Sequence, residues 1–62
     1  MITEVHDEGG NLARLEASDA DTGSHVLNGH WDPSEEQTPQ NRADFRHWFN
    51  RMLRRKGYEP IN

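Results

Sequence analysis

The chain contains no cysteine among its 62 residues. Disulfide bridges, thiolate zinc sites and thiol redox chemistry are therefore excluded. Apolar residues make up only 31% of the sequence, and the mean hydropathy is −1.16. No apolar run approaches the roughly 20 residues of a membrane-spanning helix, and no segment has the pattern of a signal peptide. We therefore expect a cytoplasmic protein without a membrane partner.

Positive charge is scarce over residues 1–40, where Arg14 stands alone against nine acids and gives a formal charge of −8. Residues 41–62 carry six basic residues against Asp44 and Glu59, which gives +4. A chain divided in this way can bind charged partners, or it can form ion pairs between its own two parts.

The basic segment over residues 38–57 has the pattern of one amphipathic helix. Thr38 is suited to cap its first turn, and Pro39 is suited to the first helical position, where no backbone N–H is needed. Gly57 can adopt the left-handed conformation that ends a helix in a Schellman motif, with Tyr58 packed on the last turn at Leu53. Apolar residues recur at i, i+3, i+4, i+7 and i+8 and predict one buried stripe, formed by Phe45, Trp48, Phe49, Met52 and Leu53.

Residues 1–17 have the pattern of a β-hairpin. Ile2–His6 is rich in β-branched residues and is followed by turn-forming residues at 7–11. Leu12–Ala17 would place alternate residues on two faces of a strand. One predicted face holds Leu12, Arg14 and Glu16, and the other holds Ala13, Leu15 and Ala17. The five-residue connection leaves the register of the two strands open.

A third strand is expected at His25–Trp31, although Asn28 and Gly29 could interrupt it. Asp32–Gln37 reads as an acidic connector, because the proline after Asp32 disfavours helix there. The sequence thus predicts a single small α+β domain over residues 1–62, with its parts at 1–31 (an antiparallel sheet of two or three strands), 32–37 (the connector), 38–57 (the helix) and 58–62 (a tail). The predicted core consists of Val5, Leu15, Val26 or Leu27, Trp31, Phe45, Trp48, Phe49, Met52 and Leu53.

No pattern of catalytic or metal-binding residues accompanies this fold. The chain has four histidines, and their spacing does not match that of known zinc ligands. They are His6, His25, His30 and His47. Residues 19–23 begin like a calcium loop, but Ser24 stands where that loop requires glycine. Glu35 and Glu36 are consecutive in a polar connector, without the surroundings that tune a catalytic acid. We expect no enzymatic activity, no metal, no cofactor and no small-molecule substrate.

The basic face of the predicted helix is the strongest functional feature. It could be a solvated face, a nucleic-acid contact or a contact with another protein. A three-stranded sheet followed by a helix is similar in topology to the small DNA-binding domains of phage-type integrases, which read DNA with the sheet. Nine acids precede the helix here, and an acidic sheet would repel phosphates. Paired acidic and basic surfaces favour a protein partner.

We therefore expect a small non-enzymatic interaction protein of the adaptor, inhibitor or regulator type, which binds a protein partner or a second copy of itself. Nucleic-acid binding through the same helix is the alternative. The small size and the high density of charge would suit an accessory protein of a phage or mobile element. The predicted partner-binding residues are Arg46, Arg51, Arg54 and Arg55 on the helix and Glu35 and Glu36 in the connector.

Overall fold

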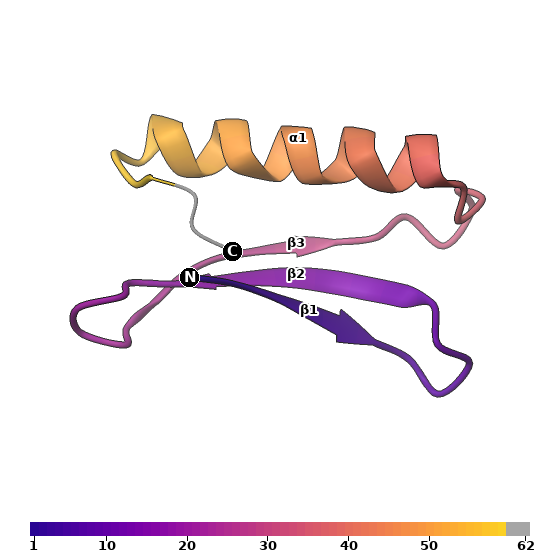
Figure 1. Ribbon diagram of the computed structural model, residues 1–62, viewed down its shortest axis with the longest axis horizontal. Helices are drawn as coiled ribbons and strands as arrows, with labels where there is room; N and C mark the ends of the chain where they lie inside the picture. The colour runs from indigo at the N-terminus through magenta and orange to yellow at the C-terminus, as the bar shows by residue number, and fades with distance from the viewer. Residues whose placement is uncertain (60–62) are drawn as a thin grey trace.

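The computed structural model describes residues 1–59 and confirms the predicted α+β fold. Three strands precede one helix, in the order β1 (Ile2–His6), β2 (Leu12–Ser18), β3 (His25–His30) and α1 (Pro39–Arg55). The strands are antiparallel, with β2 between β1 and β3, and α1 lies along one face of the sheet (Figure 1). Asn28 and Gly29 do not interrupt β3. Residues 60–62 of the predicted tail lie outside the described residues.

The helix α1 starts and stops where the sequence predicts. The Thr38 hydroxyl accepts a hydrogen bond from the Asn41 backbone N–H at 3.0 Å, and Pro39 opens the first turn. Gly57 has a φ of +91°. The Gly57 and Tyr58 N–H groups donate to carbonyls of the last turn at 3.0 and 3.1 Å, which is the paired bonding of a Schellman motif. No helix within residues 1–59 is long and apolar enough to cross a membrane.

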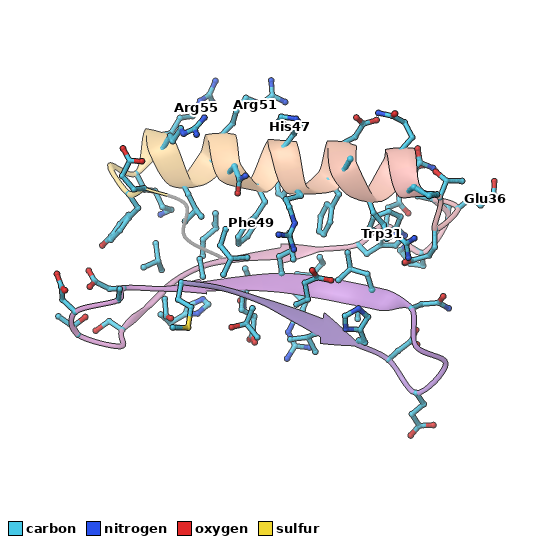
Figure 2. All side chains as sticks on the ribbon, viewed as in Figure 1. Trp31, Glu36, His47, Phe49, Arg51 and Arg55 are labelled. Carbon is cyan, nitrogen blue, oxygen red and sulfur yellow. The ribbon has the colours of Figure 1, made fainter. Side chains whose placement is uncertain are left out.

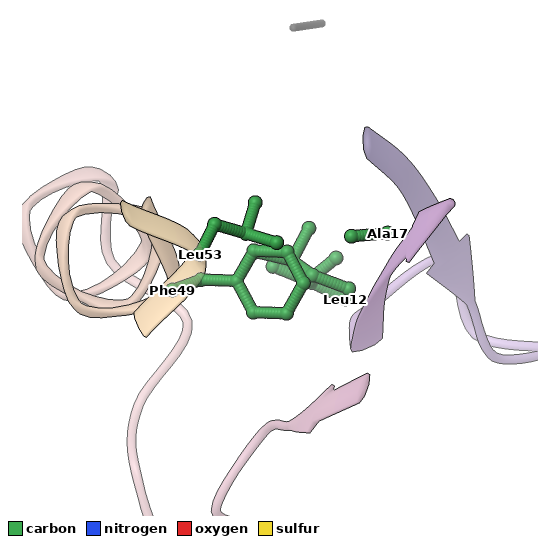
Figure 3. Packing of buried hydrophobic residues seen from close by; sticks show 5 residues of the cluster. Leu12, Ala17, Phe49 and Leu53 are labelled. Carbon is green, nitrogen blue, oxygen red and sulfur yellow. The ribbon is translucent and has the colours of Figure 1, made fainter. Parts of the chain in front are cut away.

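The core lies between α1 and the face of the sheet that it covers. Phe49 points from the helix toward the sheet, whereas Arg51 and Arg55 point away from it (Figure 2). Leu15, on the central strand, and Phe49 are both fully buried, with 0% exposure. The buried cluster (Figure 3) consists of Leu12, Leu15, Ala17, Phe49 and Leu53. Partly buried residues packed against it are Ile2, Val26, Leu27, Trp31 and Phe45.

A β-bulge in β2 overturns part of the predicted strand pattern. Val5 lies opposite Arg14, but the next residue of β1 lies opposite Leu12, so Ala13 is the extra residue. An extra residue shifts the alternation of the strand. Leu12 is therefore buried in the core, and the prediction that it shares a face with Arg14 and Glu16 is wrong. Val5 shares the uncovered face with Arg14 and is absent from the observed core, so its assignment to the core is wrong.

Gly29 is a point of close approach between β3 and α1. It pairs with Leu15 on the covered face of the sheet. A Cβ atom at this position would lie 2.8 Å from Cδ1 of Phe49 and 3.0 Å from Cζ3 of Trp48. A glycine inside a strand often marks such an approach. Here the missing side chain makes room for the two aromatic rings, which explains a turn-forming residue inside β3.

The connector between β3 and α1 is fastened to the central strand by one side chain. The Leu12 N–H donates to Oε1 of Gln37 at 3.1 Å, and Nε2 of Gln37 donates to the Leu12 carbonyl at 2.8 Å. A side-chain amide thus bonds both backbone groups of Leu12, as a neighbouring strand would. Gln37 directly precedes the N-cap Thr38, so this clamp fixes where α1 begins relative to the sheet.

Candidate functional site

The exposed side of α1 carries three of the predicted partner-binding arginines. Arg51, Arg54 and Arg55 are exposed, and Arg51 and Arg55 point away from the sheet together with His47 (Figure 2). Within residues 1–59 no ion pair is formed by these three arginines. The last acid before them is Asp44, and the next is Glu59. Their charges are therefore available to a partner.

Arg46 differs from these three arginines because it faces the sheet. Its guanidinium forms an ion pair with the carboxylate of Glu4 on β1. Glu4 also lies beside His6, with Nε2 3.5 Å from Oε1. Arg46 therefore connects α1 to the edge strand, and its part in binding a partner stays a prediction.

The predicted acidic residues lie at the other end of α1. Glu35 and Glu36 are exposed in the connector, and Glu36 projects beside the first turn of the helix (Figure 2). The backbone carbonyl of Glu36 accepts from the Thr38 N–H and from the Asn41 side chain, both at 2.9 Å. A helix of 17 residues is about 25 Å long at 1.5 Å per residue. The structure thus separates the acidic and basic groups along one helix.

A row of aromatic rings between these two ends is a feature that sequence reasoning missed. Trp31 meets Phe45 edge to face, with ring centroids 5.2 Å apart, and Phe45 stacks on Trp48 at 6.0 Å and 13°. Trp48 remains 40% exposed, so its assignment to the core is wrong. Successive residues of a helix point about 100° apart, and Phe49 takes the direction toward the sheet. Met52 is only partly buried and is also not among the core cluster.

A cavity of about 370 Å³ lies beside this aromatic row, where the end of β3, the connector and α1 meet. We call it the aromatic–acidic cavity, after six of the residues that line it beside His30 and Asn41. The aromatic residues are Trp31, Phe45 and Trp48, and the acidic residues are Asp32, Glu35 and Asp44. The spacing of Asp44, Phe45 and Trp48 along one helical side is the sequence signal that could have indicated it.

The groups around the aromatic–acidic cavity are held by short-range hydrogen bonds. The backbone N–H and the hydroxyl of Ser34 donate to Oδ1 of Asp32 at 3.0 and 2.8 Å, and these bonds hold the pKa of the Asp32 carboxyl below its ordinary value. The Trp31 indole N–H donates to the Glu35 carbonyl at 3.0 Å. Gln40 donates to Oδ1 of Asp44 at 2.9 Å. These hydrogen bonds orient the Trp31 indole and the carboxylates of Asp32 and Asp44 in the cavity wall.

The uncovered face of the sheet is not acidic, which corrects the expectation from composition. The register places on it Thr3, Val5, Arg14, Glu16, Asn28 and His30. Arg14 and Glu16 form an ion pair there at 3.4 Å. Acids from the first 40 residues lie largely in the turns and the connector, since charged residues are readily solvated there. The sheet therefore offers neither a basic surface for phosphates nor a strongly repulsive one.

The four histidines occupy separate positions, one on β1, two at the ends of β3 and one on α1. Within residues 1–59 no group of three or more His, Asp or Glu side chains converges as a metal site would require. No family model, no curated protein and no solved structure matches the chain. The candidate site is therefore defined by the chain's own surface, namely the arginines on the outer side of α1 and the aromatic–acidic cavity nearer the start of that helix.

Proposed function

We propose that this chain is a small non-enzymatic interaction protein that binds another protein through the exposed side of α1. The observation that carries the proposal is the position of Trp48, which lies near the middle of the helix with 40% of its surface exposed. Asp44 precedes it by one turn, and Arg51 and Arg55 follow it by one and two turns. Tryptophan and arginine are the residue types most enriched in the energetic centres of protein interfaces.

The small core makes an exposed tryptophan informative. Among residues 1–59 only five form the buried cluster, and burying a large apolar side chain stabilises a fold by roughly 1.5–3 kcal/mol. A domain of this size has little stability in reserve. Leaving much of the Trp48 ring in water forgoes some of that stabilisation, and burial in a partner would recover it.

Along α1 the charge changes from negative before Trp48 to positive after it. This arrangement favours a partner whose facing surface is positive beside Asp44 and negative beside Arg51. A second copy meets this condition when two α1 helices pack antiparallel, because a two-fold axis near Trp48 would place Asp44 of one copy near Arg51 of the other. A different protein with an acidic patch beside an apolar pocket would meet it equally. Sedimentation at several protein concentrations separates these partners, since only a homodimer gives a mass that rises with concentration.

Nucleic-acid binding is the second candidate, and the exposed stripe Arg51, Arg54 and Arg55 favours it. Such binding would weaken linearly with the logarithm of the salt concentration, with a slope that counts the neutralised phosphates. Titration of a labelled DNA duplex and a labelled RNA at several salt concentrations tests it. Binding that follows this slope and is lost on changing the three arginines to glutamine would replace the protein-binding proposal.

Capture from a nuclease-treated lysate, read by quantitative mass spectrometry, tests the protein partner. We expect a retained protein whose yield falls about tenfold or more for Trp48→Ser, the loss typical of an interface centre. Tyr58→Ser is the matched control, because Tyr58 is 39% exposed but lies beyond the helix. Equal capture by wild type and Trp48→Ser, or loss of every partner after nuclease treatment, would refute the proposal.

A further inference from the structure

We propose that the aromatic–acidic cavity binds the side chain of an arginine supplied by the protein partner. This inference rests on the proposed function, since it names the chemistry that the partner brings. The cavity lies beside Trp48, so a partner seated on the exposed side of α1 reaches it without leaving that surface. Three properties of the cavity support a guanidinium group as its occupant: its ring surfaces, its charge and its size.

The ring surfaces match a planar cation. A guanidinium stacks on aromatic faces, and it is attracted to them electrostatically when it lies within about 6 Å of the ring centroid. Phe45 and Trp48 stand nearly parallel, 13° apart, and Trp31 meets Phe45 edge-on. Because Trp48 is 40% exposed, ring surface remains for a further layer on the stack.

The charge of the cavity is negative and is not balanced from within. Asp32, Glu35 and Asp44 contribute carboxylates to the lining. No Lys or Arg lines the cavity within the described chain, and the single titratable base is His30. A carboxylate accepts the two parallel N–H groups of a guanidinium in a bidentate pair. An arginine would therefore meet a carboxylate rim and an aromatic wall in the same place.

The volume of the cavity and the hydrogen bonds within its wall narrow the class of ligand that it can bind. A volume of about 370 Å³ lies in the lower part of the range of roughly 300–1,000 Å³ found for ligand sites, which suits one long side chain and not a large cofactor. The Trp31 indole, the Asp32 carboxylate and the Asp44 carboxylate are already held by hydrogen bonds. An arginine can therefore bind with little rearrangement, which lowers the entropic cost of association.

Titration with short peptides, followed by ¹⁵N NMR, tests the inference. The chain has two tryptophans, and both line the cavity, so the two indole N–H signals report on it directly. The probes are acetyl-Gly-Arg-Gly-amide, its citrulline analogue, which has the same shape without the charge, and its lysine analogue. We expect both indole signals to shift with the arginine peptide, with an affinity about fivefold or more above that for citrulline, since the cation supplies the attraction.

The double variant Asp44→Asn with Glu35→Gln keeps the shape of the rim and removes two charges. Arginine affinity should fall about fivefold or more in this variant, while Glu8→Gln in the β1–β2 turn serves as the control and leaves it unchanged. Equal binding of the arginine and citrulline peptides, stronger binding of the lysine peptide, or unchanged affinity in the double variant would overturn the assignment.

The two proposals can fail separately. If the peptide titration fails while Trp48→Ser still abolishes partner capture, the arginine site is refuted and the interaction protein stands. If the arginine peptide binds as expected while capture is the same for wild type and Trp48→Ser, the cavity is a cation site and the proposed protein interface is refuted.

Discussion

Phe49 and Trp48 are consecutive aromatic residues of α1, yet they have opposite surroundings. Phe49 is completely buried against the sheet, whereas Trp48 is 40% exposed beside the aromatic–acidic cavity. Both rings contact the space beside Gly29. Their side chains point about 100° apart around the helix axis, as successive helical residues do, and this difference in direction separates the buried ring from the exposed one. The pair shows that an apolar stripe of five residues can have one edge in the core and the other edge at the surface.

The largest expected effect comes from removing the buried member of the pair. Phe49→Ala should lower the free energy of unfolding by about 3–5 kcal/mol, because it deletes a fully enclosed ring and leaves a cavity. In a domain this small we expect loss of cooperative unfolding, measured by circular dichroism during thermal and urea titrations. A melting transition close to that of the wild type would contradict the packing of Phe49 on Leu15.

A methyl group placed under the two rings should have the next largest effect. Gly29→Ala puts a Cβ atom within 3.0 Å of both aromatic side chains, and such overpacking costs about 1–3 kcal/mol. Gly9→Ala is the control, since its Cβ would lie at an ordinary 3.4 Å from Asp7, and we expect a change of about 0.5 kcal/mol or less. Equal stability of the two variants would show that α1 does not approach β3 this closely.

The exposed member of the pair should matter less for stability than for binding. Trp48→Ala should cost about 1–2 kcal/mol, because part of the ring is already in water and no enclosed cavity is left behind. The variant should remain folded by circular dichroism while it loses the partner. A destabilisation equal to that of Phe49→Ala would abolish the distinction between the two aromatic residues and return Trp48 to the core.

The smallest expected change in stability concerns Arg46, which faces the sheet, in comparison with Arg51, which faces outward. Glu4→Gln removes the ion pair with Arg46 and should cost about 0–1 kcal/mol, an amount that shrinks at high salt because exposed pairs are screened. Arg51→Gln should leave stability unchanged. Urea unfolding at two ionic strengths measures both, and a larger loss for Arg51→Gln would reverse the roles given to these arginines.

Local signals made the helix and the strands predictable. The N-cap at Thr38, Pro39 and the stop at Gly57 each act within a few residues, so they can be read without knowledge of the rest of the chain. The bulge at Ala13 could not be predicted, because it arises from the pairing of β2 with β1 and is absent from the alternation of β2 itself. The omission of Leu12 from the sequence-based core follows from that one residue. Val5 was misplaced for another reason: β1 alternates regularly from Ile2, which packs against the core, so Val5 faces the other side.

The candidate site was predictable only in part, for a related reason. Helical periodicity placed Arg51, Arg54 and Arg55 on the polar side of α1, and the structure exposes all three. The same periodicity could not indicate that Arg46 would meet Glu4, since that contact joins residues 42 positions apart. Nor could it place Trp31 beside Phe45, because that contact depends on how the connector folds back onto the sheet.

The amide of Gln37 has a consequence for the uniqueness of the native state. If α1 turned by one residue about its axis, Trp48 would take the buried place of Phe49 and Met52 that of Leu53, so apolar side chains would still face the sheet. Two such arrangements would compete on the energy landscape, and a sequence folds uniquely when local features all favour the same one. The clamp between Gln37 and Leu12 sets the rotational phase of the helix at its first turn. A neutral polar group at the margin of the domain thus helps to determine which aromatic residue is buried and which one stays exposed.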